Sequence, residues 1–369
     1  MKVHGVETRT IGVADDGFTV EVIDQTRLPF EFTTVALKTV DDAARAIREM
    51  QVRGAPLIGV TAAYGLCLQA RLDPSDAGLD AAYADLIATR PTAVNLRWAL
   101  DRMLLKLRPV PISERVDAAY AAAAELAEED VATCRAIGDH GLPLIAAAES
   151  FARDRGRDVI GLLTHCNAGW LATVDWGTAL APVYRAQDEG LPIHVWVDET
   201  RPRNQGASLT AWELAQHGVP HTVIADNTGG HLMQKGLVDL CITGSDRTAA
   251  NGDVCNKIGT YLKALAAYDN GIPFYVALPC STIDWEIADG CAEIPIEERD
   301  GQEMSRVAGM DESGKVTRVQ VVASESAVAN YAFDVTPARL VTSLITECGV
   351  FSTSVSGMRE LYAARTREE

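Results

Sequence analysis

The 369-residue sequence lacks the cysteine patterns of a structural metal site. Its eight cysteines include no C-x-x-C pair and no zinc-type spacing. His217 and His221 stand four residues apart, but Gly218 and Pro220 break any helix that would place them on one face. The sequence therefore predicts no metal centre, and it predicts small buried thiols in a reducing, cytoplasmic compartment.

An excess of positive charge is also absent, because 51 acidic residues against 33 basic ones give a net charge of −18. Such a field does not attract nucleic acid or an anionic membrane, so neither partner is predicted. The amino terminus lacks the apolar core of a signal peptide, and the longest charge-free run, Pro56 to Ala70, is shorter than a bilayer span. An anionic substrate would need cations supplied locally.

No G-x-G-x-x-G motif is present, so a dinucleotide cofactor is not indicated, and we expect no other cofactor. The composition is that of an ordinary globular protein, with 47% hydrophobic and 23% charged residues. The length is sufficient for two domains with cores of their own.

The hydrophobic pattern changes near residue 155, where we expect a boundary between domains 1–155 and 156–369. Short alternating bursts in the first ~35 residues predict a small β element. The pattern up to Phe151 is helical and rich in alanine. Helices are predicted near Asp41, after Pro56, from Pro91 as a first helical residue, over Glu114–Glu129, and again from about Val131.

After Arg157, short apolar runs alternate with helical stretches, which predicts βαβ units and a Rossmann-like parallel sheet. The expected strands are 159–163, 193–197, 222–225, 238–242 and 273–278. Gly218 and Gly236 mark expected helix ends, and the tail from Arg339 to Ala364 predicts a last helix and a strand at 350–351. The fold class is therefore α/β, with a mainly helical domain before the sheet.

Unusual polar residues follow each of the five predicted strands, in the segments 164–169, 198–206, 226–227, 245–247 and 279–281. In an open parallel sheet these loops meet at the carboxyl edge, where ligands bind. Residues 238–259 predict a strand, an acidic loop and a helix starting at Asn256 and Lys257. Free N–H groups, the helix dipole and the lysine charge would suit a phosphate there.

Two residues in these loops are candidates for chemistry. Cys166 lies in a short polar loop closed by Gly169, where a thiol can carry a proton, although packing is the usual role of a cysteine. Asp246 follows the fourth strand, and its alternative role is a helix cap or turn. We expect His165 to be structural, because neighbours in an extended segment point in opposite directions and so do not form a Cys–His pair.

Other polar residues allow two interpretations each. Asp198 and Glu199 fit either a ribose-binding pair or an ion-pair network with Arg201 and Arg203, and we favour the network for Glu199. The segments 52–56 and 89–92 each place an arginine before a helix. The forked donors of such arginines suit phosphate and hydroxyl groups, whereas a solvated arginine at an ordinary helix start is the alternative.

With these residues in view, the sequence resembles the methylthioribose-1-phosphate isomerases, the aldose–ketose isomerases of methionine salvage. The resemblance runs almost end to end and rests on IDQTRLP (23–29), VRGAPLIG (52–59), TRPTAVNL (89–96), THCNAG (164–169), DETRPRNQGA (198–207), DNTGG (226–230) and GSDRTAANGDVCNKIGTY (244–261). The resemblance implies a homodimer and shared ancestry with regulatory subunits of a translation-initiation exchange factor and with ribose-1,5-bisphosphate isomerases. It implies Cys166 and Asp246 as the catalytic pair, and substrate binding by Arg53, Gly54, Ala55, Arg90, Gln205, Asn256 and Lys257.

The expected chemistry needs neither metal nor nucleotide. A sugar with phosphate on its anomeric oxygen cannot open spontaneously, so an acid must protonate the ring oxygen, and Asp246 with a raised pKa is suited to that step. Hydrogen then moves from C2 to C1, either as a proton carried by Cys166 or as a hydride, and the sequence leaves both open. Isomerisation of 5-deoxyribose 1-phosphate or ribose 1,5-bisphosphate, and a regulatory subunit that binds a sugar phosphate or nucleotide without turnover, are the alternative functions.

Overall fold

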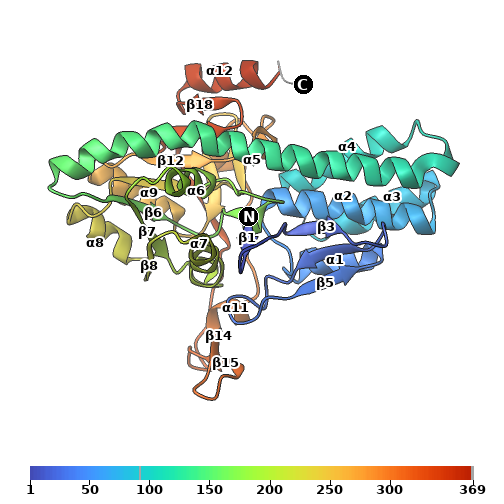
Figure 1. Cartoon of the computed structure of the whole chain (residues 1–369), viewed down its shortest axis with the longest axis horizontal. Coiled ribbons are helices and arrows are strands. Elements are labelled where there is room, and N and C mark those ends of the chain that lie inside the picture. Colours follow the sequence, from blue (N-terminus) through green and yellow to red (C-terminus); the bar gives the residue numbers. More distant parts are fainter. Residues whose placement is uncertain (91–92, 367–369) are drawn as a thin grey trace.

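The amino-terminal half of the chain is mainly helical in a computed structural model that describes residues 1–90 and 93–366. Thr39 begins the first helix with a capping box, as expected near Asp41, and the helix after Gly54 is buried along most of its length. The helices are α1 (Val40–Arg48), α2 (Ala55–Leu72), α3 (Asp76–Ile87), α4 (Val94–Leu107) and α5 (Arg115–Asp154). Figure 1 shows α5 running along the whole length of the molecule.

The predicted small β element is confirmed. It is a three-stranded antiparallel sheet of β3 (Ile11–Val13), β4 (Val20–Ile23) and β5 (Thr34–Leu37), preceded by the short pair β1 (Lys2–Val3) and β2 (Val6–Glu7). Val20, Val22 and Leu37 are buried against the helices, so the alternation of the sequence places one face of this sheet on the core.

The carboxyl-terminal half is built on a mostly parallel seven-stranded sheet in the order β18-β17-β12-β9-β6-β7-β8, in which β18 is antiparallel to β17. The strands are β6 (Ile160–Thr164), β7 (Ile193–Asp198), β8 (His221–Ile224), β9 (Leu240–Thr243), β12 (Phe274–Ala277), β17 (Ser343–Thr346) and β18 (Gly349–Phe351). The connecting helices include α6 (Ala181–Asp188), α7 (Ala211–His217), α8 (Thr228–Gln234) and α9 (Thr260–Asp269). The predicted fold class and the five predicted strands are confirmed.

The predicted helix ends at Gly218 and Gly236 are also confirmed, since both glycines adopt positive φ after α7 and α8. In the tail, β18 and α12 (Val355–Arg365) agree with the prediction, whereas β17 was not predicted.

The prediction of a helix starting at Asn256 and Lys257 is wrong. The chain instead turns at Gly252, with φ +87°, to form the antiparallel strands β10 (Arg247–Ala249) and β11 (Val254–Lys257), and α9 begins only at Thr260. The strands β13 (Ile283–Asp284) and β16 (Phe333–Thr336) complete this second sheet. Pairing with distant strands overrides the local helical pattern at these positions.

The prediction of separate helices before and after residue 130 is also wrong, because α5 is continuous from Arg115 to Asp154 and contains Pro143. Buried alanines along one side keep this helix packed against α2 and α6. The prediction of Pro91 as a first helical residue lies outside the described residues, and the helix that follows begins at Val94.

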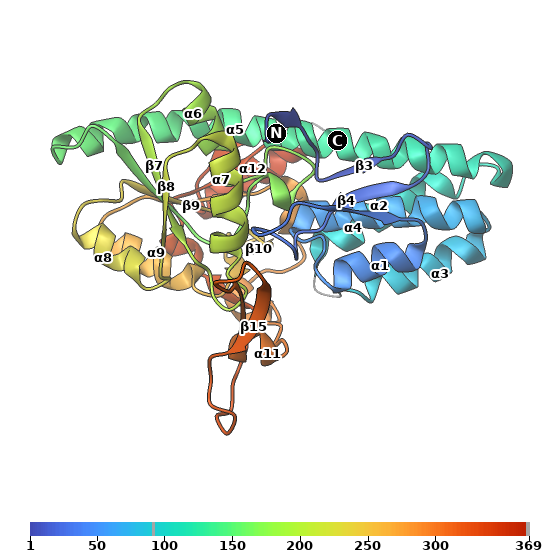
Figure 2. The ribbon, with the colours of Figure 1, turned by 60° about the horizontal axis from the view of Figure 1, so that its bottom comes forward.

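A hairpin that was not predicted projects from the body of the molecule below the junction of its two halves (Figure 2). Its strands are β14 (Arg306–Met310) and β15 (Val316–Gln320), and the short helices α10 (Gly290–Glu293) and α11 (Gln302–Ser305) precede it. The hairpin shares a cavity with loops of both halves of the chain.

The division of the chain near residue 155 stays a prediction. The long helix α5 ends at Asp154, yet it packs against α2 and α4 of the first half and against α6 and β17 of the second. Within residues 1–90 and 93–366, no helix combines the length and the apolar character that crossing a bilayer requires.

Candidate active site

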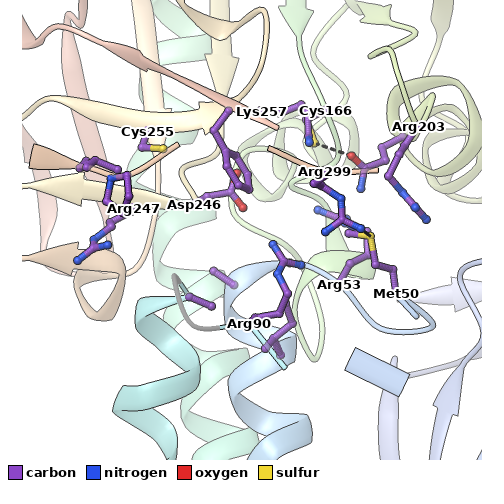
Figure 3. A pocket seen from close by; sticks show the side chains of 18 residues that line it. Met50, Arg53, Arg90, Cys166, Arg203, Asp246, Arg247, Cys255, Lys257 and Arg299 are labelled. Carbon is purple, nitrogen blue, oxygen red and sulfur yellow. Dashed lines mark hydrogen bonds between the residues drawn. The ribbon is translucent and has the colours of Figure 1, made fainter. Parts of the chain in front are cut away.

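Residues from distant parts of the chain line one cavity at the carboxyl edge of the parallel sheet, facing the start of α2 (Figure 3). Eight of the nine predicted site residues are there: Arg53, Gly54, Ala55, Arg90, Cys166, Gln205, Asp246 and Lys257. The ninth, Asn256, lines an adjoining cavity that shares Arg53, Cys166 and Asp246 with the first. This placement agrees with the rule that ligands bind outside the carboxyl ends of the strands.

Cys166 lies two residues after β6, with φ +66°, in a backbone conformation that turns the chain sharply. Thr200 accepts a hydrogen bond from the Cys166 N–H at 2.8 Å, and Thr210 donates one to its carbonyl at 2.7 Å. Cys166 is 7% exposed, and its thiol donates to the Gln205 side-chain oxygen at 3.6 Å, the bond marked by the dashed line in Figure 3. Cys166 is therefore held rigidly against Gln205.

Burial raises the pKa of the Cys166 thiol above its ordinary value, while the positive charges of Arg53 and Lys257 act in the opposite direction. The resting group is consequently a neutral thiol next to two cations. Such a thiol can release its proton to a nearby base, and the thiolate that remains can take a proton up.

Asp246 lies three residues after β9, and its backbone N–H donates to the Cys255 carbonyl at 3.0 Å. Burial raises the pKa of its carboxyl group, and Lys257, Arg53 and Arg90 oppose that shift. The direction agrees with the requirement for a carboxylic acid that keeps its proton near neutral pH.

Lys257 is the last residue of β11, so its charge reaches the cavity from a strand end and not from the predicted helix start. Its side chain is 7% exposed and lies over the Phe333 ring at 4.9 Å. Burial lowers the pKa of Lys257, and Cys166 and Asp246 oppose that effect. Asn256 precedes Lys257 in the strand, so the side chains of these two residues point to opposite sides and line adjoining cavities. The Asn256 amide donates to the Thr260 hydroxyl at 3.0 Å.

Arg53 is oriented by a chain of buried hydrogen bonds that the sequence analysis missed. Its guanidinium donates to the side-chain oxygen and, at 2.7 Å, to the backbone oxygen of Asn167. The Asn167 amide in turn donates to Glu213 at 2.6 Å. Glu213 is fully buried, and burial raises the pKa of its carboxyl to about 8. Only the position of Asn167 beside Cys166 in a polar loop could have suggested this role.

The start of α2 offers a second anchor for an anion. Gly54 caps the helix with φ +92° and no side chain, which leaves the first N–H groups of α2 available to a ligand. A Cβ atom at Gly54 would lie 2.4 Å from the Ala172 carbonyl oxygen, so this close approach requires glycine.

Four further arginines of the cavity are already paired with carboxylates, and one of them is Arg247, which pairs with Asp284. Arg90 lies 3.5 Å from Glu297, and Arg203 lies 2.8 Å from Glu303. Arg299, which sequence analysis missed, lies 2.7 Å from Glu297 and 2.9 Å from Glu303. Such pairing leaves Arg53 and Lys257 as the cavity cations without an ion pair among residues 1–90 and 93–366.

Apolar side chains form the remaining wall of the cavity. They come from the α1–α2 connection, from α2, from the start of α4 and from the segments around 294 and 333, and they are Met50, Ile58, Ala93, Ile294, Pro295 and Phe333. The cavity therefore combines a cationic, hydrogen-bonding side with an apolar one.

His165 is fully buried, and its two ring nitrogens lie 2.8 Å from Asp198 Oδ2 and 2.8 Å from the Ile258 carbonyl. Both nitrogens have protein partners, which agrees with the predicted structural role. Asp198 also pairs with Lys263 at 3.1 Å, so it serves a buried ionic cluster. Burial raises the pKa of Asp198, and His165 and Lys263 oppose that shift.

The favoured prediction of an ion-pair network of Glu199 with Arg201 and Arg203 is wrong, because these pairs do not form among the described residues. Arg203 pairs with Glu303, and the Arg201 guanidinium donates to the carbonyls of Pro202 and Met304. Thr200 and Arg201 instead donate their backbone N–H groups to Asp226, each at 2.7 Å. The carboxylate that holds this loop is therefore that of Asp226, which follows the strand β8.

The fold and the site define a class of proteins. The model of the Initiation factor 2 subunit family matches residues 51–353. A crystal structure of the translation initiation factor eIF-2B subunit delta from A. fulgidus has a TM-score of 0.77 and 40% identity, and the match covers 94% of this chain and 96% of that one.

Closer sequence similarity is found to one enzyme of that class. The methylthioribose-1-phosphate isomerase of Paramagnetospirillum magneticum is 64% identical over 365 residues, which are 99% of this chain and 100% of that protein. The crystal structure of 5-methylthioribose 1-phosphate isomerase from Pyrococcus horikoshii OT3 has a TM-score of 0.82 and 38% identity, over 97% of this chain and 96% of that one. The chain belongs to the Initiation factor 2 subunit family, and within it to the methylthioribose-1-phosphate isomerases.

Proposed function

We propose that this chain converts 5-methylthioribose 1-phosphate to 5-methylthioribulose 1-phosphate in methionine salvage. The observation that carries the proposal is the meeting of Cys166 and Asp246 in one cavity with two unpaired cations, Arg53 and Lys257. The identity of 64% to an isomerase of that name over nearly the whole chain supports it independently.

Binding of the phosphate is assigned to Arg53, Lys257 and the N–H groups at the start of α2. Arg53 is held in place by Asn167, so little conformational entropy is lost when it meets the ligand. The net charge of the chain is −18, and these groups supply the local positive charge that an anionic substrate needs. Gln205, Asn256 and Arg90 offer donors and acceptors to the sugar hydroxyls.

Ring opening is assigned to Asp246. The C1–O4 bond breaks when the ring oxygen receives the proton of the carboxyl group, and the raised pKa of Asp246 keeps that proton available. The carboxylate that remains is stabilised by Lys257, Arg53 and Arg90, whose charges all favour the ionised form.

Transfer of hydrogen from C2 to C1 is assigned to the side of the cavity that holds Cys166. In one route the carboxylate left on Asp246 after ring opening takes the thiol proton of Cys166, and the thiolate then takes the C2 proton to give an enediol-type intermediate. Cys166 returns that proton to C1, and the thiolate takes up the proton that the C2 hydroxyl loses as the ketone forms. In the other, hydride moves directly and Cys166 positions the substrate. Exclusion of water protects either intermediate, and Cys166 at 7% exposure lies in such an environment.

The test is incubation of the purified protein with methylthioribose 1-phosphate in deuterated water. Formation of the ketose establishes the activity, and deuterium at C1 of the product identifies proton transfer. A wild-type protein that binds the substrate but leaves it unchanged would instead support the regulatory, non-catalytic alternative.

The walls of the cavity favour one phosphate and an apolar C5 substituent. Arg203 and Arg299 are neutralised by Glu303 and Glu297, so a second phosphate would find no free partner among them. The apolar residues around Phe333 suit a methylthio group, and they also suit the smaller 5-deoxyribose 1-phosphate. Ribose 1,5-bisphosphate is the less favoured substrate.

A homodimer and a cytoplasmic location are part of the proposal. None of the eight cysteines, all of which lie within the described residues, is in a disulfide, which supports a reducing compartment. Sedimentation velocity of the purified chain tests the dimer, because a mass equal to one chain at micromolar concentration would exclude it.

A further inference from the structure

A second cavity, here called the outer chamber, adjoins the catalytic cavity. It is lined by the segments 25–30, 49–53 and 202–209 and by the hairpin β14–β15. Met50, Arg53, Arg203 and Gln205 line both spaces, so the two are contiguous. The motif IDQTRLP, which has no role in the catalytic cavity, forms one wall of the outer chamber.

Gln25 and Gln51 line this chamber, and their side-chain oxygens are covered by protein atoms in the structure. Gln25 is 4% exposed and donates its amide to the Leu171 carbonyl at 2.6 Å, which fixes the orientation of the amide. Gln51 donates its amide to Asp24 at 3.4 Å. Within the described residues, the side-chain oxygens of both, and that of Asn204, are buried without a partner. Buried acceptors are usually satisfied, so a ligand whose hydroxyl groups reached these three oxygens from the chamber would remove the cost of leaving them without a partner.

Two exposed arginines of the hairpin face the same chamber. Ala308 and Arg318 are paired in register, and Arg306 lies two residues before Ala308, so all three lie on one face of the hairpin. Two carboxylates also line the chamber, but Glu303 is paired with Arg203 and Arg299. The chamber is therefore net positive in a chain whose overall charge is strongly negative.

We propose that the outer chamber is a second subsite for the phosphosugar, which is captured there before it enters the catalytic cavity. Arg306 and Arg318 attract the phosphate, and the sugar hydroxyls donate to Gln25, Gln51 and Asn204. A polyol that carries one phosphate is the class of ligand with both features. The inference rests on the proposed function, because capture is read out through turnover.

The first test is the double variant R306Q/R318Q, assayed with methylthioribose 1-phosphate at low and high salt. Loss of two steering charges is expected to lower kcat/KM about tenfold at ~20 mM salt, with kcat unchanged. The loss should shrink to less than about twofold at ~500 mM salt, where charges are screened over a few ångströms. Both arginines are exposed, so the variant should fold normally.

The matched control is R27Q, which removes an exposed charge from the same neighbourhood but not from the chamber lining. It should leave kcat/KM within about twofold of the wild type. An equal loss in R27Q and in the double variant, or no loss in the double variant, would overturn the proposal.

The second test is Q51M, which removes one acceptor and keeps the volume. Here kcat/KM should fall at every salt concentration with kcat unchanged, because a hydrogen bond is not screened as a charge pair is. A fall in kcat alone would assign Gln51 to the reaction itself and reject the subsite. A wild-type protein without turnover would reject the proposed function, which is a separate outcome from these.

Discussion

Burial raises the pKa of two carboxyl groups, one that lines the cavity and one that lies behind it, and the two groups have different roles. Asp246 faces the cavity, where a proton held near neutral pH can be given to a substrate. Glu213 lies behind Asn167, where a carboxyl group fixes the orientation of Arg53. Both have a raised pKa because water is excluded from them.

Asp246→Asn should lower kcat by roughly 10²–10⁴-fold, because the amide keeps the size of the side chain but is no acid. In the wild type, kcat/KM should fall as pH rises through the raised pKa of Asp246, since the reactive form is the protonated one. That alkaline decline should be absent from the residual rate of the variant. Asp311→Asn, at the exposed tip of the hairpin, is the control and should behave as wild type.

Cys166→Ser should reduce turnover by a similar order if the thiol carries the proton, because a serine hydroxyl is a much weaker acid. The measurement is kcat together with deuterium incorporation from solvent. Near-normal turnover in this variant would remove Cys166 from the proton-carrying role and leave direct hydride transfer.

Glu213 should make stability depend on pH. Its pKa is raised to about 8 in the folded protein, so between about pH 4 and 8 the unfolded chain releases a proton that the folded one retains. The free energy of unfolding should therefore decline across that window, by on the order of 5 kcal/mol. Denaturant unfolding of the wild type and Glu213→Gln at pH 5 and 8.5 checks this, and equal pH dependence in both would contradict it.

At the residue scale, the sequence indicated two groups that follow a strand in a polar loop, Cys166 and Asp246, and the family resemblance added Gln205. It did not indicate Glu213, because the role of Glu213 depends on Asn167, which is distant in the sequence. It did not indicate Arg299 either: its carboxylate partners Glu297 and Glu303 are near in the sequence, but its place in the cavity depends on the tertiary fold. Nothing local distinguishes a buried glutamate on a helix from a solvated one.

At the scale of the elements, the site depends on how closely α2 approaches the loop after β6. Gly54 begins α2 in a conformation that L-residues rarely adopt, against the backbone of Ala172. The alternation of short apolar runs with helical stretches was sufficient to predict the parallel sheet, because buried parallel strands read as continuous hydrophobic runs. The pair β10–β11 escaped prediction, since its three- and four-residue strands owe their form to pairing with distant β13 and β16.

Gly54→Ala should lower kcat/KM at least about tenfold and destabilise the fold by ~2–3 kcal/mol, because its Cβ would lie 2.4 Å from the Ala172 oxygen. Gly271→Ala is the matched control. Gly271 has φ +64° but open space around its Cβ position, so strain alone should cost ~1–2 kcal/mol with activity retained. Equal kinetic effects in the two variants would show that the approach to Ala172 does not matter for the site.

At the scale of the whole molecule, charge is distributed unevenly: in a strongly acidic chain, cations outnumber carboxylates in the lining of one cavity and of the chamber in front of it. The composition of the sequence gives the strongly negative net charge, and the requirement for local cations at an anion-binding site follows from that charge. The pairing of Arg203 and Arg299 with glutamates could not be foreseen, although it decides how many phosphates the cavity favours.

Substrate discrimination tests this distribution of charge. Ribose 1,5-bisphosphate should show a kcat/KM at least ~10²-fold below that of methylthioribose 1-phosphate, because its second phosphate would be desolvated without a free cation. Side-by-side kinetics of the two sugars provide the measurement. Comparable values would mean that the pairs around Glu297 and Glu303 open to admit an anion.

The length of α5 has a mechanical consequence. Forty residues of unbroken helix form a rod of about 60 Å that packs against both halves of the chain. Because this helix packs against both halves, it fixes their relative position, and the halves cannot close around a ligand by a hinge motion. Entry and release of a ligand must then depend on motion of smaller segments, such as the hairpin β14–β15 and the loops that face it. Crosslinking the hairpin to these loops should stop turnover and leave the rest of the fold unchanged.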